Sequence, residues 1–149
     1  MIVSGRYVSI DGIYRPFVVA SLLSSSGAWV DVPFLVDSGA DATFLDHSCL
    51  AYLGIDVSSL PVKDDAGGVA GSLSYYEFPT QVRMEGESNE AKVFSGNIGI
   101  LTAPEASDTP ILGRDILDHF AAIFDRRRER VLLIAEPDDY QILRPSEGG

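Results

Sequence analysis

Residues 33–43 read Pro-Phe-Leu-Val-Asp-Ser-Gly-Ala-Asp-Ala-Thr, and this short stretch says more about the fold than any other part of the chain. Its four apolar residues predict a strand that is buried on both faces. The strand is expected to hold Asp37 in a water-poor setting, where the hydroxyl of Ser38 and the backbone N–H of Gly39 orient its carboxylate. Gly39 also permits a tight turn and the close approach of a partner. Taken alone, Asp-Ser-Gly is a common turn tripeptide, so a solvated turn is the alternative interpretation.

Short strands separated by Gly- and Pro-containing turns are predicted on both sides of this stretch, which indicates an all-β fold. One short helix is expected to be capped by Asp46 or Ser48 and to end at Gly54. Residues 1–149 are expected to form a single domain whose tail, 136–149, is loose. The predicted strands cover residues 6–10, 14–23, 28–36 and 43–45, a hairpin over 62–82, residues 91–101, and a final hairpin of 121–125 and 130–135.

The hairpin over residues 62–82 carries a glycine-rich tip, Gly67-Gly68-Val69-Ala70-Gly71. Three glycines and two small apolar residues predict a mobile tip that can lie close over a peptide backbone. An ordinary flexible turn is the alternative. A phosphate-binding loop is excluded, because no Lys-Ser/Thr follows and the setting is not strand-to-helix.

A third feature is Ile111-Leu112-Gly113-Arg114-Asp115, an apolar run that ends in glycine and leads into a short helix from about Asp115. By itself, core packing explains this run. Together and in this order, however, the three stretches resemble the retropepsin family, the single-domain peptidases typified by retroviral proteases. The resemblance covers roughly residues 13–135.

Each stretch matches a motif of that family. Residues 35–40 are similar to its catalytic signature, apolar-apolar-Asp-Thr/Ser-Gly-Ala, and residues 111–115 to the apolar-apolar-Gly-Arg-Asp/Asn run before its helix. The resemblance implies a closed, barrel-like acid-protease fold with one or two short helices and a β-hairpin flap. Two departures are that Ser38 stands where retroviral enzymes more often have Thr, and that residues 77–108 form a longer stretch than in compact viral examples.

The resemblance also implies the activity and the roles of the residues. The chain is expected to be an aspartic endopeptidase that hydrolyses extended peptides with Asp37 as its catalytic carboxylate. Asp41 is expected to pair with Arg114 and so to brace the active-site loop near a dimer seam, although two unrelated surface charges are the alternative. The remaining site residues are Ser38, Gly39 and Ala40 as support, and Gly67, Gly68, Val69, Ala70 and Gly71 as the substrate-binding flap.

This chemistry needs two carboxyl groups that share one proton, because two like charges a few ångström apart do not both ionise cheaply. The chain offers one Asp-Ser/Thr-Gly. Asp11-Gly12 lacks the hydroxyl residue, and Asp108-Thr109-Pro110 lacks the glycine. The sequence therefore predicts a homodimer with the two Asp37 side chains on a two-fold axis.

Composition narrows the remaining function classes. The net charge of -11 disfavours nucleic acid and anionic membranes as partners. No Cys/His spacing resembles a metal site, the proposed chemistry requires no cofactor, and the free thiol of Cys49 fits a reducing compartment. No signal peptide is recognised and no apolar run approaches the roughly 20 residues of a membrane span. We therefore expect a soluble, cytoplasmic protein.

Two other functions remain open at this point. The fold could serve as a catalytically idle dimerisation or peptide-binding module, although the complete Asp-Ser-Gly argues against a degenerate site. A small β-barrel binding domain unrelated to peptidases would require all three motifs to be coincidence. For Tyr75 and Tyr76, lining a subsite and packing within a strand are both open. His47, His119, Cys49 and the turn Arg126-Arg127-Arg128 are interpreted as packing or surface residues.

Overall fold

The computed structural model describes residues 1–65 and 73–145 of the chain, which are mostly β-strand, as predicted. Two short α-helices and two 3-10 turns are the only helical elements in this part of the chain. The strands are β1 (Ile2–Ile10), β2 (Ile13–Leu23), β3 (Trp29–Val36), β4 (Phe44–Leu45), β5 (Val62–Asp65), β6 (Leu73–Glu85), β7 (Ala91–Leu101), β8 (Ile111–Leu112), β9 (Ala121–Asp125) and β10 (Arg130–Ile134). The helices are α1 (Cys49–Tyr52) and α2 (Arg114–Leu117), and the 3-10 turns are η1 (Val57–Ser59) and η2 (Arg126–Arg128).

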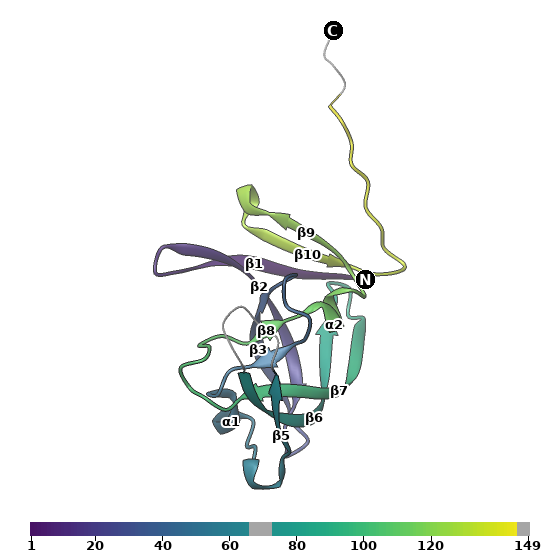
Figure 1. The fold of residues 1–149 in the computed structure, drawn as a ribbon. Helices are drawn as coiled ribbons and strands as arrows, with labels where there is room; N and C mark the ends of the chain where they lie inside the picture. The colour runs from purple at the N-terminus through teal and green to yellow at the C-terminus, as the bar shows by residue number, and fades with distance from the viewer. Residues whose placement is uncertain (66–72, 146–149) are drawn as a thin grey trace.

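The strands form one sheet that closes on itself in part (Figure 1). The order is β5-β6-β7-β4-β8-β3-β2-β1-β10-β9, and a further pairing of β2 with β6 completes a ring of six strands. That closing contact is short, with Ser21 opposite Arg83 and Leu22 opposite Val82. The ring is not a regular barrel, because β4 and β8 have two residues each and β3–β8 and β4–β7 are parallel.

Outside the ring, β1 joins two parts of the sheet. Its first half pairs with β10 and its second half pairs with β2, and both pairings are antiparallel. The turn between β1 and β2 uses Asp11 and Gly12, whose φ values of 52° and 77° suit the tight turns that connect hairpin strands. At the end of the sheet, β9 pairs with β10 alone among the described residues, so its other edge is open.

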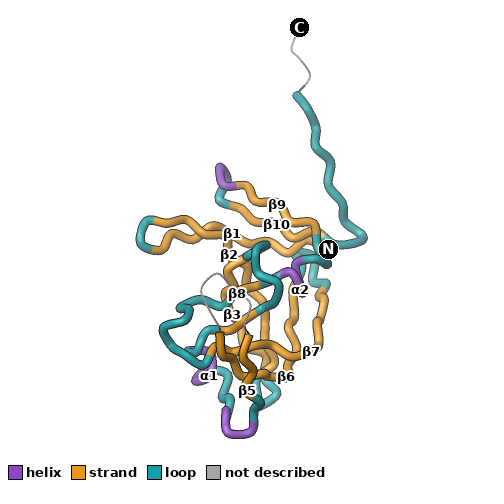
Figure 2. Tube along the Cα trace, in the orientation of Figure 1, coloured by secondary structure: helices purple, strands orange, loops and turns teal. Residues whose placement is uncertain are grey.

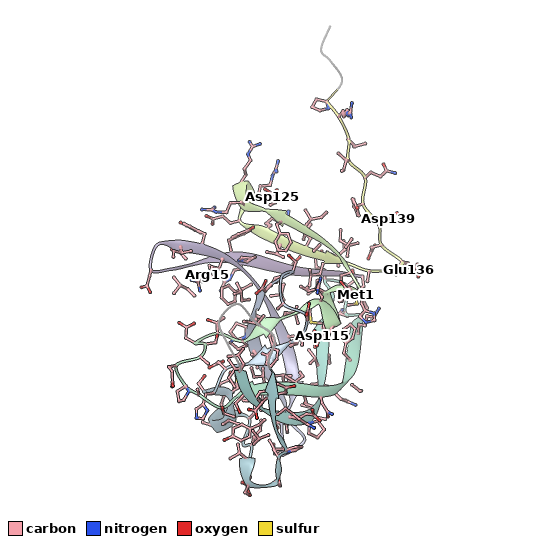
Figure 3. The ribbon with its side chains drawn as sticks, viewed as in Figure 1. Met1, Arg15, Asp115, Asp125, Glu136 and Asp139 are labelled. Carbon is pink, nitrogen blue, oxygen red and sulfur yellow. The ribbon has the colours of Figure 1, made fainter. Side chains whose placement is uncertain are left out.

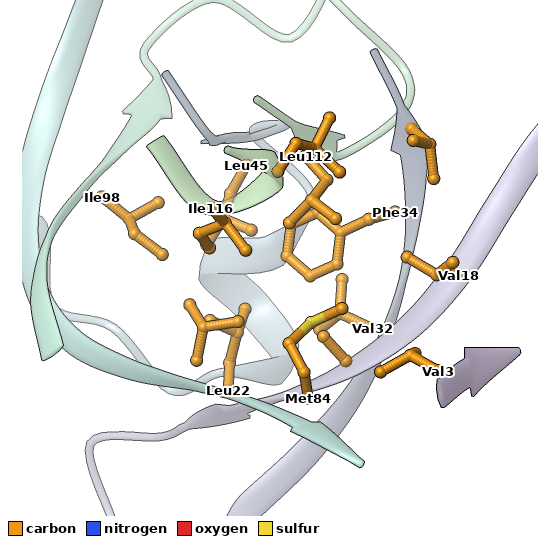
Figure 4. Packing of buried hydrophobic residues seen from close by; sticks show 14 of the residues in the cluster. Val3, Val18, Leu22, Val32, Phe34, Leu45, Met84, Ile98, Leu112 and Ile116 are labelled. Carbon is orange, nitrogen blue, oxygen red and sulfur yellow. The ribbon is translucent and has the colours of Figure 1, made fainter. Parts of the chain in front are cut away.

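The core fills the inside of the ring (Figure 4). Leu22, Phe34, Leu45 and Leu112, from four different strands, are each fully buried. Burial alternates along β3, where Phe34 and Val36 point inward while Pro33 is exposed. The prediction that this strand is buried on both faces is therefore wrong: only the inner face of the ring is covered within one chain.

The two residues expected to cap the helix after β4 lie next to its start, with Ser48 at the N-cap position. The carboxylate of Asp46 accepts the N–H of Ser48 at 3.2 Å, whereas Ser48 itself makes no side-chain cap. The chain turns away at Gly54, which has a φ of 63°. Such a left-handed residue favours glycine, because a Cβ atom there is strained.

The last described residues leave the strands as an extended segment (Figure 2). Its start is held at Asp138, whose carboxylate forms an ion pair with the amino group of Met1. Further on, Ile142 and Leu143 are 86% and 82% exposed. No helix in the described ranges, 1–65 and 73–145, is long and apolar enough to cross a membrane.

Candidate active site

The site is built by two loops that leave neighbouring strands. Residues 37–43 follow β3, and residues 113–115, which are Gly113 and the first two residues of α2, follow β8. The two strands are parallel, with Leu35 opposite Ile111 and Val36 opposite Leu112. Because parallel strands end at the same edge of a sheet, the two loops lie side by side.

Asp37 stands where β3 ends, and backbone groups fix its position. Its own N–H donates to the carbonyl oxygen of Leu112 at 3.1 Å, and the N–H of Gly39 donates to its Oδ1 at 2.9 Å. A further turn bond joins the N–H of Ala40 to the carbonyl of Asp37 at 3.2 Å. Within the described chain, the hydroxyl of Ser38 makes no hydrogen bond to this carboxylate.

The surroundings of Asp37 differ from those expected. Its side chain is half-buried, and Ser38 and Gly39 are exposed. The predicted water-poor setting is therefore wrong for the single chain, because the described part of the chain leaves the tip of the loop open to solvent. A second molecule or a substrate would be needed to exclude water from it.

The two loops are joined through their backbones. The N–H groups of Arg114 and Asp115 donate to the carbonyl oxygens of Ala40 and Asp41, at 2.8 and 3.2 Å. At Gly113 the loops approach so closely that a Cβ atom there would lie 2.4 Å from the carbonyl carbon and oxygen of Ala42. The glycine in the run at residues 111–115 therefore serves this contact rather than general core packing.

The side chains of Asp41 and Arg114 form an ion pair across the two loops. Both are well exposed, with 85% of the Asp41 and 50% of the Arg114 side chain accessible to solvent. Exposed ion pairs contribute only about 0–1 kcal/mol to stability, because water screens them and two long side chains lose freedom. Within one chain this pair is therefore a weak brace.

A second side-chain link between the loops is one that the sequence did not indicate. Thr43 is 2% exposed, and both of its polar groups find partners in the loop after β8. Its N–H donates to Asp115 Oδ2 at 3.0 Å and its hydroxyl to Asp115 Oδ1 at 2.7 Å, while its Oγ1 accepts the N–H of Gly113 at 3.0 Å. Asp115 lies on α2, below β9 and β10 (Figure 3). The signal that could have found this link is a threonine between apolar strand residues, since a buried hydroxyl needs a partner.

The predicted flap tip, residues 67–71, lies outside the described residues. The strands that lead to it, β5 and β6, pair from Val62 opposite Tyr76 to Asp65 opposite Leu73. Tyr75 contacts the ring of Phe44 edge-on, with 5.4 Å between ring centroids, and Tyr76 packs against the core. These contacts favour strand packing for both tyrosines over the open alternative of a subsite.

The other residues that sequence analysis weighed lie in packing or surface positions. Cys49 is fully buried, and its sulfur lies 2.6 Å from the hydroxyl of Tyr52 and 3.3 Å from Asp46 Oδ1. Burial, which disfavours the thiolate, raises the pKa of Cys49 to about 12. The ring of His119 lies against that of Phe94 with 53° between the ring planes, and the guanidinium of Arg126 lies over the ring of Tyr14 at 3.9 Å.

Comparison with known proteins agrees with this architecture. A family model described as "Aspartyl protease" matches residues 24–116, which include both loops of the site. A retropepsin-like aspartic protease from Rickettsia conorii has a similar structure, with a TM-score of 0.60 at 18% identity over 89% of this chain and 91% of that one. The EIAV protease in complex with the inhibitor HBY-793 matches with a TM-score of 0.48 at 20% identity, over 74% of this chain and 92% of that one. No curated protein matches the chain.

Proposed function

The chain belongs to the aspartyl protease family, and from that premise we propose that it is an aspartic endopeptidase, active as a homodimer in which each copy contributes Asp37. The observation that carries this proposal is the position of Asp37. It follows a strand of the ring, it is held by the N–H of Gly39, and its loop is tied to the loop after β8. A surface turn has no need of such bracing.

The chemistry requires the two Asp37 carboxyl groups to share one proton. The ionised carboxylate takes a proton from water as general base, and the protonated carboxyl polarises the scissile carbonyl as general acid. Water attacks the carbonyl carbon to give a tetrahedral intermediate, whose C–N bond then breaks as the leaving amine takes the proton that the general base removed from water, so no covalent acyl-enzyme forms. The two acids titrate as a pair rather than as separate sites.

Three features support a second copy as the source of the other acid. The sequence contains a single Asp-Ser/Thr-Gly. The tip of the loop, Ser38 and Gly39, is exposed in the single chain although the chemistry favours a dry site. In addition, the open edge of β9 offers unpaired backbone groups to another strand, and we propose that β9 of a symmetry-related copy pairs with it across a two-fold axis.

The substrate in this proposal is an extended peptide held by backbone hydrogen bonds, as a strand added to a sheet edge. Residues 67–71 are proposed to close over it. Neither a metal ion nor an organic cofactor takes part in the proposed steps. Asp37 follows directly on β3, and Gly113 follows directly on β8, so both segments of the site start from strands of the sheet.

The test is a peptide-library digest with wild-type protein and with Asp37→Asn, in the presence and absence of a pepstatin-type inhibitor, from acidic to neutral pH. We expect cleavage by the wild type, loss of it in Asp37→Asn and in the inhibited sample, and the same sedimentation coefficient for both proteins. A wild-type dimer that never cleaves would favour an idle dimerisation or peptide-binding module. Cleavage by purified Asp37→Asn would refute the catalytic role of Asp37.

A further inference from the structure

We propose that Asp115 is the principal positioning residue of the catalytic loop, a role that rests on the proposed peptidase function. The ion pair of Asp41 and Arg114 is the more obvious brace, but it is exposed on both sides. The link from Asp115 to Thr43 differs because one of its partners is buried. Thr43 is 2% exposed, whereas Asp115 itself is exposed, and without Asp115 the N–H and the hydroxyl of Thr43 lose the acceptors that the structure gives them.

The hydrogen bonds of Asp115 use both oxygens of a carboxylate. Oδ2 accepts the N–H of Thr43, and Oδ1 accepts the hydroxyl of Thr43 together with the N–H of Ile116. All three partners are donors, and an ionised carboxylate accepts without donating. An asparagine in the same place presents an NH2 group to at least one N–H, so a side chain of the same shape satisfies fewer partners.

The link also connects α2 with the backbone groups that hold Asp37. Thr43 Oγ1 accepts the N–H of Gly113, which precedes the helix, and the carbonyl of Leu112 accepts the N–H of Asp37. A displacement of Thr43 therefore changes the position of residues 112 and 113, against which Asp37 is held. A displacement of about 1 Å at a catalytic group is enough to lower a rate by about 100-fold.

The experiment compares Asp115→Ala, Asp115→Asn, Thr43→Val and Thr43→Ser with the wild type. Thr43→Val removes the hydroxyl at nearly constant shape, and Thr43→Ser keeps it. We expect kcat to fall by about 10- to 100-fold in Asp115→Ala and Thr43→Val and less in Asp115→Asn, with KM within about twofold of the wild type and near-normal kcat in Thr43→Ser. The double variant Asp115→Ala/Thr43→Val is expected to be no worse than the poorer single variant, because both remove the same link.

Asp118→Ala is the matched control. This carboxylate lies three residues further along, at the exposed end of α2, and in the described chain it has no hydrogen-bond or ion-pair partner. We expect its kcat to equal that of the wild type. Thermal unfolding of every variant separates loss of the fold from loss of positioning. If Asp115→Ala does not fold, Thr43→Val and Asp115→Asn decide the outcome.

A second readout does not depend on activity. In amide hydrogen exchange and 1H–15N spectra, Asp115→Ala is expected to expose the N–H of Thr43 and to shift the resonance of Gly39, whose N–H contacts Asp37. Unchanged Gly39 and Thr43 amides, or an unchanged kcat in a folded Asp115→Ala, would overturn the positioning role. A wild type without peptidase activity would overturn the proposed function instead. The amide measurements alone would then test whether Asp115 positions Thr43 and the loop of Asp37.

Discussion

Gly113 lies so close to Ala42 that the position has no room for a side chain: a Cβ atom would lie 2.4 Å from the carbonyl carbon and oxygen of Ala42. The φ of Gly113 is -97°, which any residue adopts, so the requirement for glycine is one of space and not of backbone conformation. Both sides of this contact are backbone, and neither moves without moving one of the two loops of the candidate site.

Gly113→Ala is therefore expected to destabilise the protein by about 1–3 kcal/mol or to displace the loop of Asp37, because overpacking forces the backbone apart. Urea unfolding would measure the loss of stability, with the dependence of the unfolding free energy on urea concentration expected to be unchanged. Gly96→Ala is the control, because that position in β7 is exposed and a Cβ atom there meets nothing within 4 Å. Equal stability of the two variants would contradict the close approach.

Arg114→Ala tests the exposed ion pair. Because the pair is accessible to water, its loss is expected to change the free energy of unfolding of the single chain by only about 0–1 kcal/mol. If the pair instead becomes covered in a dimer, the dissociation constant rises in the variant, which analytical ultracentrifugation over a dilution series measures. An Arg114→Ala protein that stays a stable dimer yet loses turnover would contradict a bracing role at the seam.

Ala122→Lys tests the open edge of β9. Ala122 is exposed on that strand, and a lysine on a sheet edge opposes pairing with another strand. The variant is expected to keep its thermal stability as a single chain while its dimer dissociates at concentrations where the wild type stays associated. Ser95→Lys, on an exposed position of β7, is the control. Equal association of both variants with the wild type would place the interface elsewhere.

Cys49 is expected to be inert toward alkylation in the native protein. Burial raises the pKa of its thiol from 9.0 to about 12, so the folded state holds a proton that the unfolded state releases. The stabilising contribution of this group is therefore fully present below about pH 9 and is lost as the pH rises toward about 12. Iodoacetamide labelling followed by mass spectrometry is expected to be slow at pH 8 without urea and fast with it. Rapid labelling of the folded protein would show that the thiol is accessible.

The sequence predicted the strands well because their signals are local. The turn at Asp11-Gly12 and the short run of residues 130–135 lie within a few residues of where the structure has them. Burial of β3 was predicted wrongly, since four consecutive apolar residues do not reveal that Pro33 faces outward. That property depends on which strands lie opposite, and these come from distant parts of the chain.

The candidate site, like the fold, was predictable from the sequence only in part. Asp37 and Gly39 stand in a motif of adjacent residues, and the pairing of Asp41 with Arg114 came from a family resemblance rather than from either residue alone. The link from Thr43 to Asp115 joins residues 72 positions apart, and although a threonine between apolar residues indicates that its hydroxyl needs a partner, neither residue type says which partner that is. Only the parallel pairing of β3 with β8 brings them together.

The two residue pairs that join β2 to β6 have a consequence for how the protein is made. Ser21 and Leu22 meet partners about 60 residues later in the chain, so this contact forms only after a long segment has been synthesised and its ends have met. Chains dominated by such distant pairings fold slowly compared with helical proteins of equal length. Because the loop of Asp37 lies between strands of the same ring, a nascent or half-folded chain does not hold Asp37 in its final position, and the proposed peptidase activity would arise only in the finished fold.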